Sequence, residues 1–477
     1  MSENFNNIAA KGIGWSAIER FSVQGVTFVV QIVLARLLTP EAFGIVGMLT
    51  IFLQVAQVFI DSGFANALIK KQDCTDTDYS TVFFYNLGVS IILYLILFFS
   101  APLISVFYSV SLITPVLRVL SFILIINALS IVQKTILVKN IDFKSQSKVT
   151  LLSSVLSGLL GVSLAYMGWG VWALVAQQVI NSILILILYV YTVKWYPNLS
   201  FSKHSFLYVF NYGSKLLASS LISVVYHNMY TIVIGKKFTS YELGLYTRAE
   251  AFAIFPSNNI GSIISRAAFP LLSKVQDDNV KLVGYYKKLI KFSSFIIFPL
   301  MLGLLVVAKP FILVILSEKW IGAVPLLQVL CISWMFDHLC NLNLQLLYVI
   351  GRTDLVLKLE IIKKAIAISI LIFSIPFGLI GMCWGLVVYT AFAVIVNTYY
   401  TNKLFEYNWI SQLKDYFPYL LASILMTVIV FWVENLFTLP IVQLMIGILT
   451  GVAVYGILTL LFFRNIINTI RTLIIKK

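Results

Sequence analysis

The sequence carries charged side chains inside long apolar segments, where a charge is costly. Placing an ionisable residue at the bilayer centre costs about 2.5 to 3.5 kcal/mol on insertion scales, so such residues usually face a partner or a water-filled cavity. The cations in this position are Arg20, Arg118, Lys215 and Arg248, and the acids are Glu19, Asp61, Glu250 and Asp337. These residues are the candidates for polar chemistry within a membrane.

Two simpler explanations compete with a functional role for these charges. Glu19 beside Arg20 and Glu250 near Arg248 form candidate ion pairs that would offset the cost of burial. Arg118 and Lys215 lie near the ends of their segments, where a long side chain can extend to the membrane surface.

Polar side chains recur at spacings of three and four residues, which places them on one face of a helix. Gln24 belongs to such a face near the N-terminus, Asp61 ends a second one, and Asn259 and Asp337 lie on two more. These faces predict the lining of a central cleft. The alternative is that they join helices through hydrogen bonds, each worth roughly 0.6 kcal/mol on average.

No pattern in the sequence indicates catalysis, a metal or a cofactor. The three histidines and four cysteines lack ligand spacing. The chain has no Ser/His/Asp arrangement and no phosphate-binding glycine loop followed by Lys-Ser/Thr. The net charge of +15 is spread over short stretches between apolar segments, which argues against nucleic-acid binding. We therefore expect neither an enzyme nor a metalloprotein.

The composition defines the elements that position these residues. Of the 477 residues, 60% are apolar and 11% charged, against about 25% charged in soluble domains. Long continuous apolar segments predict helices, because backbone groups in lipid must be satisfied internally. We expect an all-α polytopic membrane protein with about fourteen spans. The segments are 12–38, 42–66, 79–101, 112–133, 148–168, 170–192, 206–235, 243–268, 290–308, 322–349, 356–376, 378–401, 416–436 and 440–463.

Charge and repetition organise these spans. Most lysines and arginines fall in loops on the side that holds both termini, which predicts that both termini are cytoplasmic. RLLTPEAFG at 36–44 aligns with KKFTSYELG at 236–244, an offset that indicates duplication. We expect an N-terminal lobe over 1–200, a C-terminal lobe over 201–405, and two additional helices with a tail over 406–477.

The duplicated segment resembles a known family. VVQIVLARLLTPEAFGIVGM and DSGFANALIKKQDCTDTDYSTVFFYN are similar to the polysaccharide-transport branch of the multidrug/oligosaccharidyl-lipid/polysaccharide exporter superfamily. WGVWALVAQQ, FNYGSKLLASSL, ELGLYTRAEAFAIFP and AAFPLLSKVQ extend the similarity, so that it covers most of 12–276.

The resemblance implies a flippase of the cytoplasmic membrane that moves undecaprenyl-diphosphate-linked oligosaccharide by alternating access. The product would be O-antigen, capsule or exopolysaccharide, with membrane lipids, a polymerase and chain-length machinery as partners. It implies diphosphate binding at Arg20 and Arg248, and Lys215 and Arg118 follow as further candidates because they are the other cations within the apolar segments. The polar residues within the spans are candidates for the cavity lining or for ion coupling, namely Glu19, Gln24, Asp61, Glu250, Asn259 and Asp337.

Two other functions remain open at this point. A cation-coupled multidrug exporter of the same superfamily would need an acidic or apolar cavity, and a non-transporting assembly protein would leave the polar faces without a permeant. The genomic neighbourhood and drug-efflux measurements would discriminate among the three.

Overall fold

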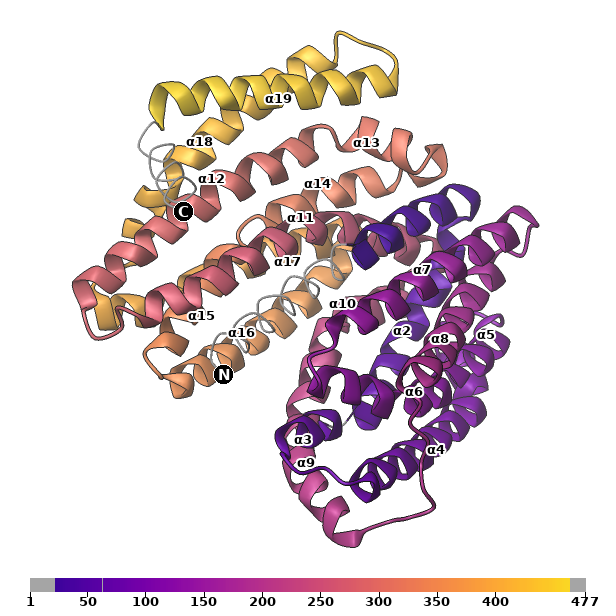
Figure 1. Cartoon of the computed structure of the whole chain (residues 1–477). Coiled ribbons are helices and arrows are strands. Elements are labelled where there is room, and N and C mark those ends of the chain that lie inside the picture. Colours follow the sequence, from indigo (N-terminus) through magenta and orange to yellow (C-terminus); the bar gives the residue numbers. More distant parts are fainter. Residues whose placement is uncertain (1–21, 62, 464–477) are drawn as a thin grey trace. The chain divides into compact units, whose positions relative to one another are not determined.

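All regular elements that the structure describes are helices. The computed structural model describes residues 22–61 and 63–463, without the side chains of residues 211, 212, 215 and 216. Within this part the chain folds into helices of 7 to 34 residues and two short 3-10 turns (Figure 1). The all-α prediction is confirmed.

Ten helices in the described residues are long and apolar enough to cross a membrane, or eleven if a bent pair over 217–237 counts as one. One of the ten covers Thr353–Phe405 and contains two helices that pack against each other. The helix Ser22–Leu37 is short in its described part, and the prediction of fourteen spans remains a prediction.

The chain forms two compact units, Met1–Gly244 and Leu245–Lys477. In the first unit α6 packs against both α4 and α8, α7 packs on α8, and α2 contacts α9. Its helices are α2 (Pro40–Asp61), α3 (Phe64–Lys70), α4 (Asp76–Tyr108), α5 (Ile113–Leu120), α6 (Phe122–Lys139), α7 (Phe143–Tyr166), α8 (Val171–Val193), α9 (Lys203–His227) and α10 (Met229–Lys237). The expected lobe boundaries at 200 and 405 remain predictions.

A clamp of polar contacts, here called the loop clamp, fastens the segments before α4 and after α8. Asp78 is 2% exposed, and both of its carboxylate oxygens lie 2.7 Å from the Lys71 ammonium nitrogen, which donates to them. Thr75 and Asp78 form a capping box at the start of α4. The backbone N–H groups of Asn198 and Ser202 donate to the Ser80 and Thr81 hydroxyls at 2.9 and 3.0 Å. The motif at 71–81 is therefore explained by the folding of the first unit.

The duplicated segment forms a reciprocal crossing of two helix starts. α2 begins at Pro40 and α11 (Ser240–Ser273) at Ser240, which preserves the offset of 200. A β-carbon on Gly44 would overlap the Ser240 carbonyl oxygen, and one on Gly244 would overlap the Pro40 carbonyl oxygen. Each glycine thus allows the other helix to approach at backbone distance.

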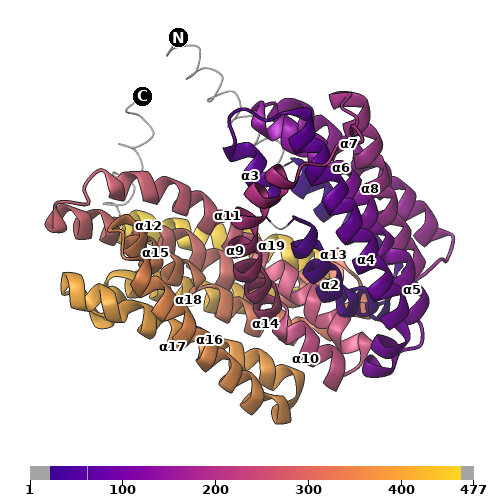
Figure 2. The same ribbon diagram turned by 90° about the horizontal axis from the view of Figure 1, so that it is seen from below.

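In the second unit α12 packs on α18, α18 on α19, and α14 lies against both α12 and α17. α16 and α17 run side by side, as both Figure 1 and Figure 2 show. The elements after α11 are α12 (Asn279–Val306), α13 (Ala308–Ile315), η1 (Glu318–Trp320), α14 (Ala323–Trp334), α15 (Asp337–Val349), α16 (Thr353–Ser374), η2 (Ile375–Phe377), α17 (Gly378–Phe405), α18 (Trp409–Glu434) and α19 (Pro440–Phe462).

A buried amide pair joins three helices of the second unit. Asn343 of α15 and Gln412 of α18 exchange two hydrogen bonds of 3.1 Å, and the Thr401 hydroxyl of α17 donates to Asn343 at 2.9 Å. All three residues are fully buried. A fully satisfied polar group in an apolar core fixes which helices meet and in which register.

Replacing Gln412 by leucine is expected to lower the free energy of unfolding by about 1 to 3 kcal/mol, because Asn343 loses its amide partner while remaining buried. Thermal unfolding of the purified protein in detergent measures the change. Gln72→Leu, at an exposed position, is the matched control and should leave the midpoint unchanged. A Gln412→Leu midpoint equal to that of the control would contradict the role of the amide pair.

Candidate functional site

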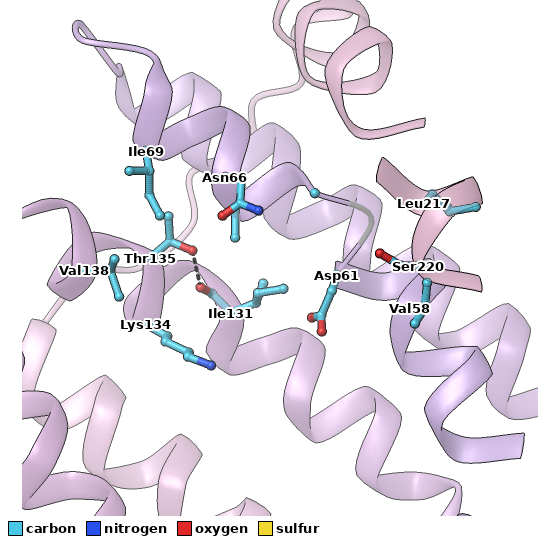
Figure 3. Close-up of a pocket in the computed structure, with 12 residues that line it drawn as sticks. Val58, Asp61, Asn66, Ile69, Ile131, Lys134, Thr135, Val138, Leu217 and Ser220 are labelled. Carbon is cyan, nitrogen blue, oxygen red and sulfur yellow. Dashed lines mark hydrogen bonds between the residues drawn. The ribbon is translucent and has the colours of Figure 1, made fainter. Parts of the chain in front are cut away.

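A cavity of about 460 Å³, lined by both polar and apolar side chains, lies within the first unit. Figure 3 shows that its walls come from α2, α3, α6 and α9. We call it the Asp61 pocket. Its lining comprises Val58, Asp61, Gly63, Ala65, Asn66, Ile69, Ile131, Lys134, Thr135, Val138, Leu217 and Ser220.

The pocket exists because one long apolar segment is broken. α2 ends at Asp61, and Gly63 takes a left-handed conformation with φ 72° before α3 begins at Phe64. Glycine adopts this conformation without steric cost, whereas other residues rarely do. The break places Asp61 and Asn66 on the two sides of the same opening, where both are exposed.

A chain of amides orients the Asp61 carboxylate. Asn127 Nδ2 of α6 donates to Gln57 Oε1 at 3.0 Å, and Gln57 Nε2 donates to Asp61 Oδ1 at 3.0 Å. Because the Gln57 oxygen is held by Asn127, its NH₂ group must face Asp61. One carboxylate oxygen is thus held in place by the protein.

Lys134 brings the opposite charge to the pocket. Figure 3 shows its side chain extending from α6 on the same side of the cavity as the Asp61 carboxyl. Both side chains are exposed, and within the described part of the chain no ion pair joins them. The neighbouring Thr135 is buried and donates to the Ile131 carbonyl at 2.7 Å. The pocket therefore combines one carboxylate and one ammonium group with amide and hydroxyl side chains.

Several predicted site residues lie where the structure gives little information. Arg20 and Glu19 lie outside the described residues. The backbone of Lys215 belongs to α9, and its side chain is not described. Gln24 is half-buried on the helix Ser22–Leu37. The roles predicted for these four residues remain predictions.

Arg118 contacts a residue of its own helix bundle. Its Nε donates to the Phe98 carbonyl at 3.2 Å, and its guanidinium lies 4.4 Å from the centre of the Phe98 ring. This stacking is a cation–π contact. It offsets part of the cost of the half-buried guanidinium, and the diphosphate role of Arg118 remains a prediction.

Arg248 and Glu250 are both half-buried on α11. Residues two apart on a helix do not face each other, and Glu250 Oε1 accepts a hydrogen bond from the Tyr246 hydroxyl at 2.8 Å. Arg248 thus points to a different side of α11 from Glu250. It remains a candidate for binding an anion.

The other two predicted polar residues bond locally. Asn259 Nδ2 donates to the Phe255 carbonyl at 2.8 Å, and Asp337 Oδ2 accepts from Asn341 at 2.8 Å. On the same polar face as Asp337, Ser333 is buried and meets Thr390 of α17 at 2.9 Å. Part of that face therefore joins helices inside the second unit.

The sequence analysis did not identify Lys134 and Asn127, because Lys134 lies one residue beyond the predicted span 112–133 and Asn127 is an uncharged residue within it. Both lie on α6, seven residues apart, which is two helical turns and hence the same face. That spacing is the signal that would have identified them.

An apolar groove of about 760 Å³ lies in the second unit between α12, α18 and α19. Its lining includes Pro299, Gly303, Met426, Val430 and Gly451. Such a surface is suited to acyl or isoprenoid chains. In the residues that the structure describes, no group of three His, Cys, Asp or Glu is arranged to hold a metal ion.

Comparisons with known sequences agree on one family. A family model described as "Polysaccharide biosynthesis protein" matches residues 33–325. The teichuronic acid biosynthesis protein TuaB of Bacillus subtilis is 30% identical over 347 residues, which cover 72% of this chain and 72% of TuaB. The lipopolysaccharide biosynthesis protein WzxC of Escherichia coli is 27% identical over 391 residues, which cover 81% of this chain and 78% of WzxC.

The fold is also similar to that of a solved transporter. The lipid II flippase MurJ, in an inward closed conformation, aligns with a TM-score of 0.75 at 18% identity. The alignment covers 95% of this chain and 99% of MurJ. This likeness extends to the C-terminal helices, beyond the region that the family model matches.

Proposed function

The chain belongs to the polysaccharide biosynthesis protein family, and on that premise we propose that it is a flippase for lipid-linked oligosaccharide. Its substrate is an undecaprenyl-diphosphate-linked repeat unit. The protein moves the headgroup from the cytoplasmic to the outer leaflet of the cytoplasmic membrane, for O-antigen, capsule or exopolysaccharide assembly. The coarser statement, a multi-pass membrane protein of polysaccharide export, rests on its relatives and on its apolar helices.

The substrate's chemistry explains why such a protein needs polar groups within helices. Sugars and a diphosphate cannot enter hydrocarbon without replacing their hydration, because burying an unpaired polar group costs several kcal/mol. Polar side chains such as those of the Asp61 pocket replace part of that water. The isoprenoid tail needs no such replacement and can remain in lipid or lie along the apolar groove.

The observation that carries the proposal is the extent of the family match. Residues 33–325 include the whole Asp61 pocket and Arg248. The relatives that the chain resembles are named for teichuronic acid and lipopolysaccharide biosynthesis, two pathways that build extracellular glycans.

Orientation and partners belong to the same proposal. The distribution of lysines and arginines supports cytoplasmic termini. A polymerase and chain-length machinery would consume the translocated repeat unit on the outer side.

Reconstitution tests the proposal directly. Proteoliposomes that contain the purified chain should move a fluorescent undecaprenyl-diphosphate-linked oligosaccharide between leaflets, at a rate at least tenfold above that of protein-free liposomes. A membrane-impermeant quencher of the label measures the fraction in the outer leaflet. Liposomes with an unrelated polytopic protein are the control for leakage, and a rate equal to that control would contradict the flippase function. Transport of cationic dyes in its place would favour the multidrug exporter.

A further inference from the structure

We propose that the Asp61 pocket binds one sugar ring of the glycan headgroup. The proposal rests on the flippase function and names a subsite for its substrate. It assigns Asp61, Lys134, Asn66 and Ser220 to the recognition of hydroxyl groups, and it gives Asp61 a role other than ion coupling.

The opposite charges of the pocket disfavour a simple ion as its ligand. Lys134 repels a bare cation near Asp61, and Asp61 repels an anion near Lys134, since both side chains line one cavity. A neutral polyol experiences neither repulsion. Each sugar hydroxyl is both a donor and an acceptor, so a hydroxyl can donate to the carboxylate while another accepts from the ammonium.

The remaining polar groups fit the same ligand. Asn66 carries an amide that both donates and accepts, and the Ser220 hydroxyl does likewise. Asp61 Oδ1 is already held by Gln57, whereas Oδ2 carries no hydrogen bond from the described residues. The free oxygen is the acceptor that the amide chain positions for a ligand.

Size and apolar lining agree with a sugar ring. A cavity of about 460 Å³ falls in the range of about 300 to 1,000 Å³ that is typical of small-molecule sites. Val58, Ile131, Val138 and Leu217 line the wall. These side chains can cover the C–H faces of a pyranose, which are apolar, while the polar groups meet its hydroxyls.

Gln57 and Asn127 are positioning residues in this arrangement. Gln57 donates to Asp61 and Asn127 donates to Gln57, each through a hydrogen bond of 3.0 Å, and neither residue lines the cavity. Gln57→Glu should weaken glycan binding by repelling Asp61, and a second change, Asp61→Asn, should relieve that repulsion and make the double variant no worse than Asp61→Asn alone.

The test compares two lipids on the protein in nanodiscs. The first is undecaprenyl diphosphate, and the second is undecaprenyl diphosphate carrying the repeat unit extracted from the organism that encodes this chain. The Kd of undecaprenyl diphosphate divided by the Kd of the glycan-bearing lipid gives the part of the affinity that the glycan supplies. Asp61→Asn and Lys134→Met should each reduce this ratio by about tenfold or more, because each removes a hydrogen bond to a charged group. Both should leave the Kd of undecaprenyl diphosphate unchanged.

Lys148→Met is the matched control, since Lys148 is an exposed lysine on α7 outside the pocket. A second measurement does not depend on losing an interaction. In a Cys74→Ser background, where the other three cysteines are buried, Ser220→Cys should react with a maleimide. The glycan-bearing lipid should slow this reaction at least tenfold, and undecaprenyl diphosphate should not.

The outcomes separate this proposal from the flippase function. Wild-type protein that binds neither lipid would refute the flippase function and the subsite with it. Wild-type protein that binds both lipids equally, or variants that keep the wild-type ratio, would refute only the subsite. Loss of a sodium dependence of transport in Asp61→Asn, with the ratio intact, would identify the pocket as a cation site and overturn the proposal.

Discussion

Arg248→Ala is expected to slow the movement of lipid-linked oligosaccharide in proteoliposomes at least tenfold. Arg248 is half-buried on α11, where burying a charge is costly. Under the proposed function that cost is offset when the guanidinium binds the substrate diphosphate through two parallel hydrogen bonds. Alanine removes both bonds. Arg248→Lys keeps the charge but not the planar fork, and should retain an intermediate rate.

The control is Arg352→Ala. Arg352 forms an exposed ion pair with Asp354 at 2.9 Å, with side chains 46% and 54% exposed. Exposed pairs contribute about 0 to 1 kcal/mol, so this variant should transport at the wild-type rate. Wild-type transport by Arg248→Ala would remove Arg248 from the diphosphate site. The thermal unfolding midpoint of Arg248→Ala, measured in parallel, separates loss of substrate binding from loss of the fold.

Gly44→Val is expected to prevent the first unit from folding correctly. The new side chain would overlap the Ser240 carbonyl oxygen, a backbone atom that no rotamer change can move. Overpacking of a core costs about 1 to 3 kcal/mol and occasionally more, and a backbone obstacle belongs at the upper end. The yield of monodisperse protein on gel filtration and the thermal unfolding midpoint both measure the effect.

Gly88→Val on α4 provides the comparison, because no atom lies within 4 Å of a β-carbon there. It should purify with a yield close to wild type. Gly244→Val should match Gly44→Val, and the double variant should cost less than the two single changes added together, since both act on one crossing. Normal yield and stability of Gly44→Val would show that the crossing tolerates separation.

The helical class and the internal repeat could be predicted because both depend on patterns along the chain. A long apolar segment in lipid has to be helical. The repeated segments 36–44 and 236–244 contain the starts of α2 at Pro40 and of α11 at Ser240. The break at Gly63 was not predicted. It depends on a single left-handed residue, Gly63, inside the segment 42–66 that the sequence predicts as one span.

The candidate site was only partly predictable, since a polar stripe gives the direction of a side chain but not its neighbour. Asp61 was identified from its stripe, but its donor Gln57 meets Asn127 only because α2 packs beside α6. Ser333 shared a stripe with Asp337 and yet bonds to α17. Lys363 lies within the predicted span 356–376, but its burial to 6% exposure and its ion pair with Glu360 were not predicted.

The loop clamp has a consequence for how chains of this kind are classified. The side chains of Lys71 and Thr75 both bond to Asp78. The hydroxyls of Ser80 and Thr81 accept hydrogen bonds from the backbone N–H groups of Asn198 and Ser202. None of these contacts involves the Asp61 pocket. Two exporters that carry different glycans can therefore have the same residues in the loop clamp. Grouping chains by this stretch sorts them by architecture, and the cargo has to be inferred from other positions.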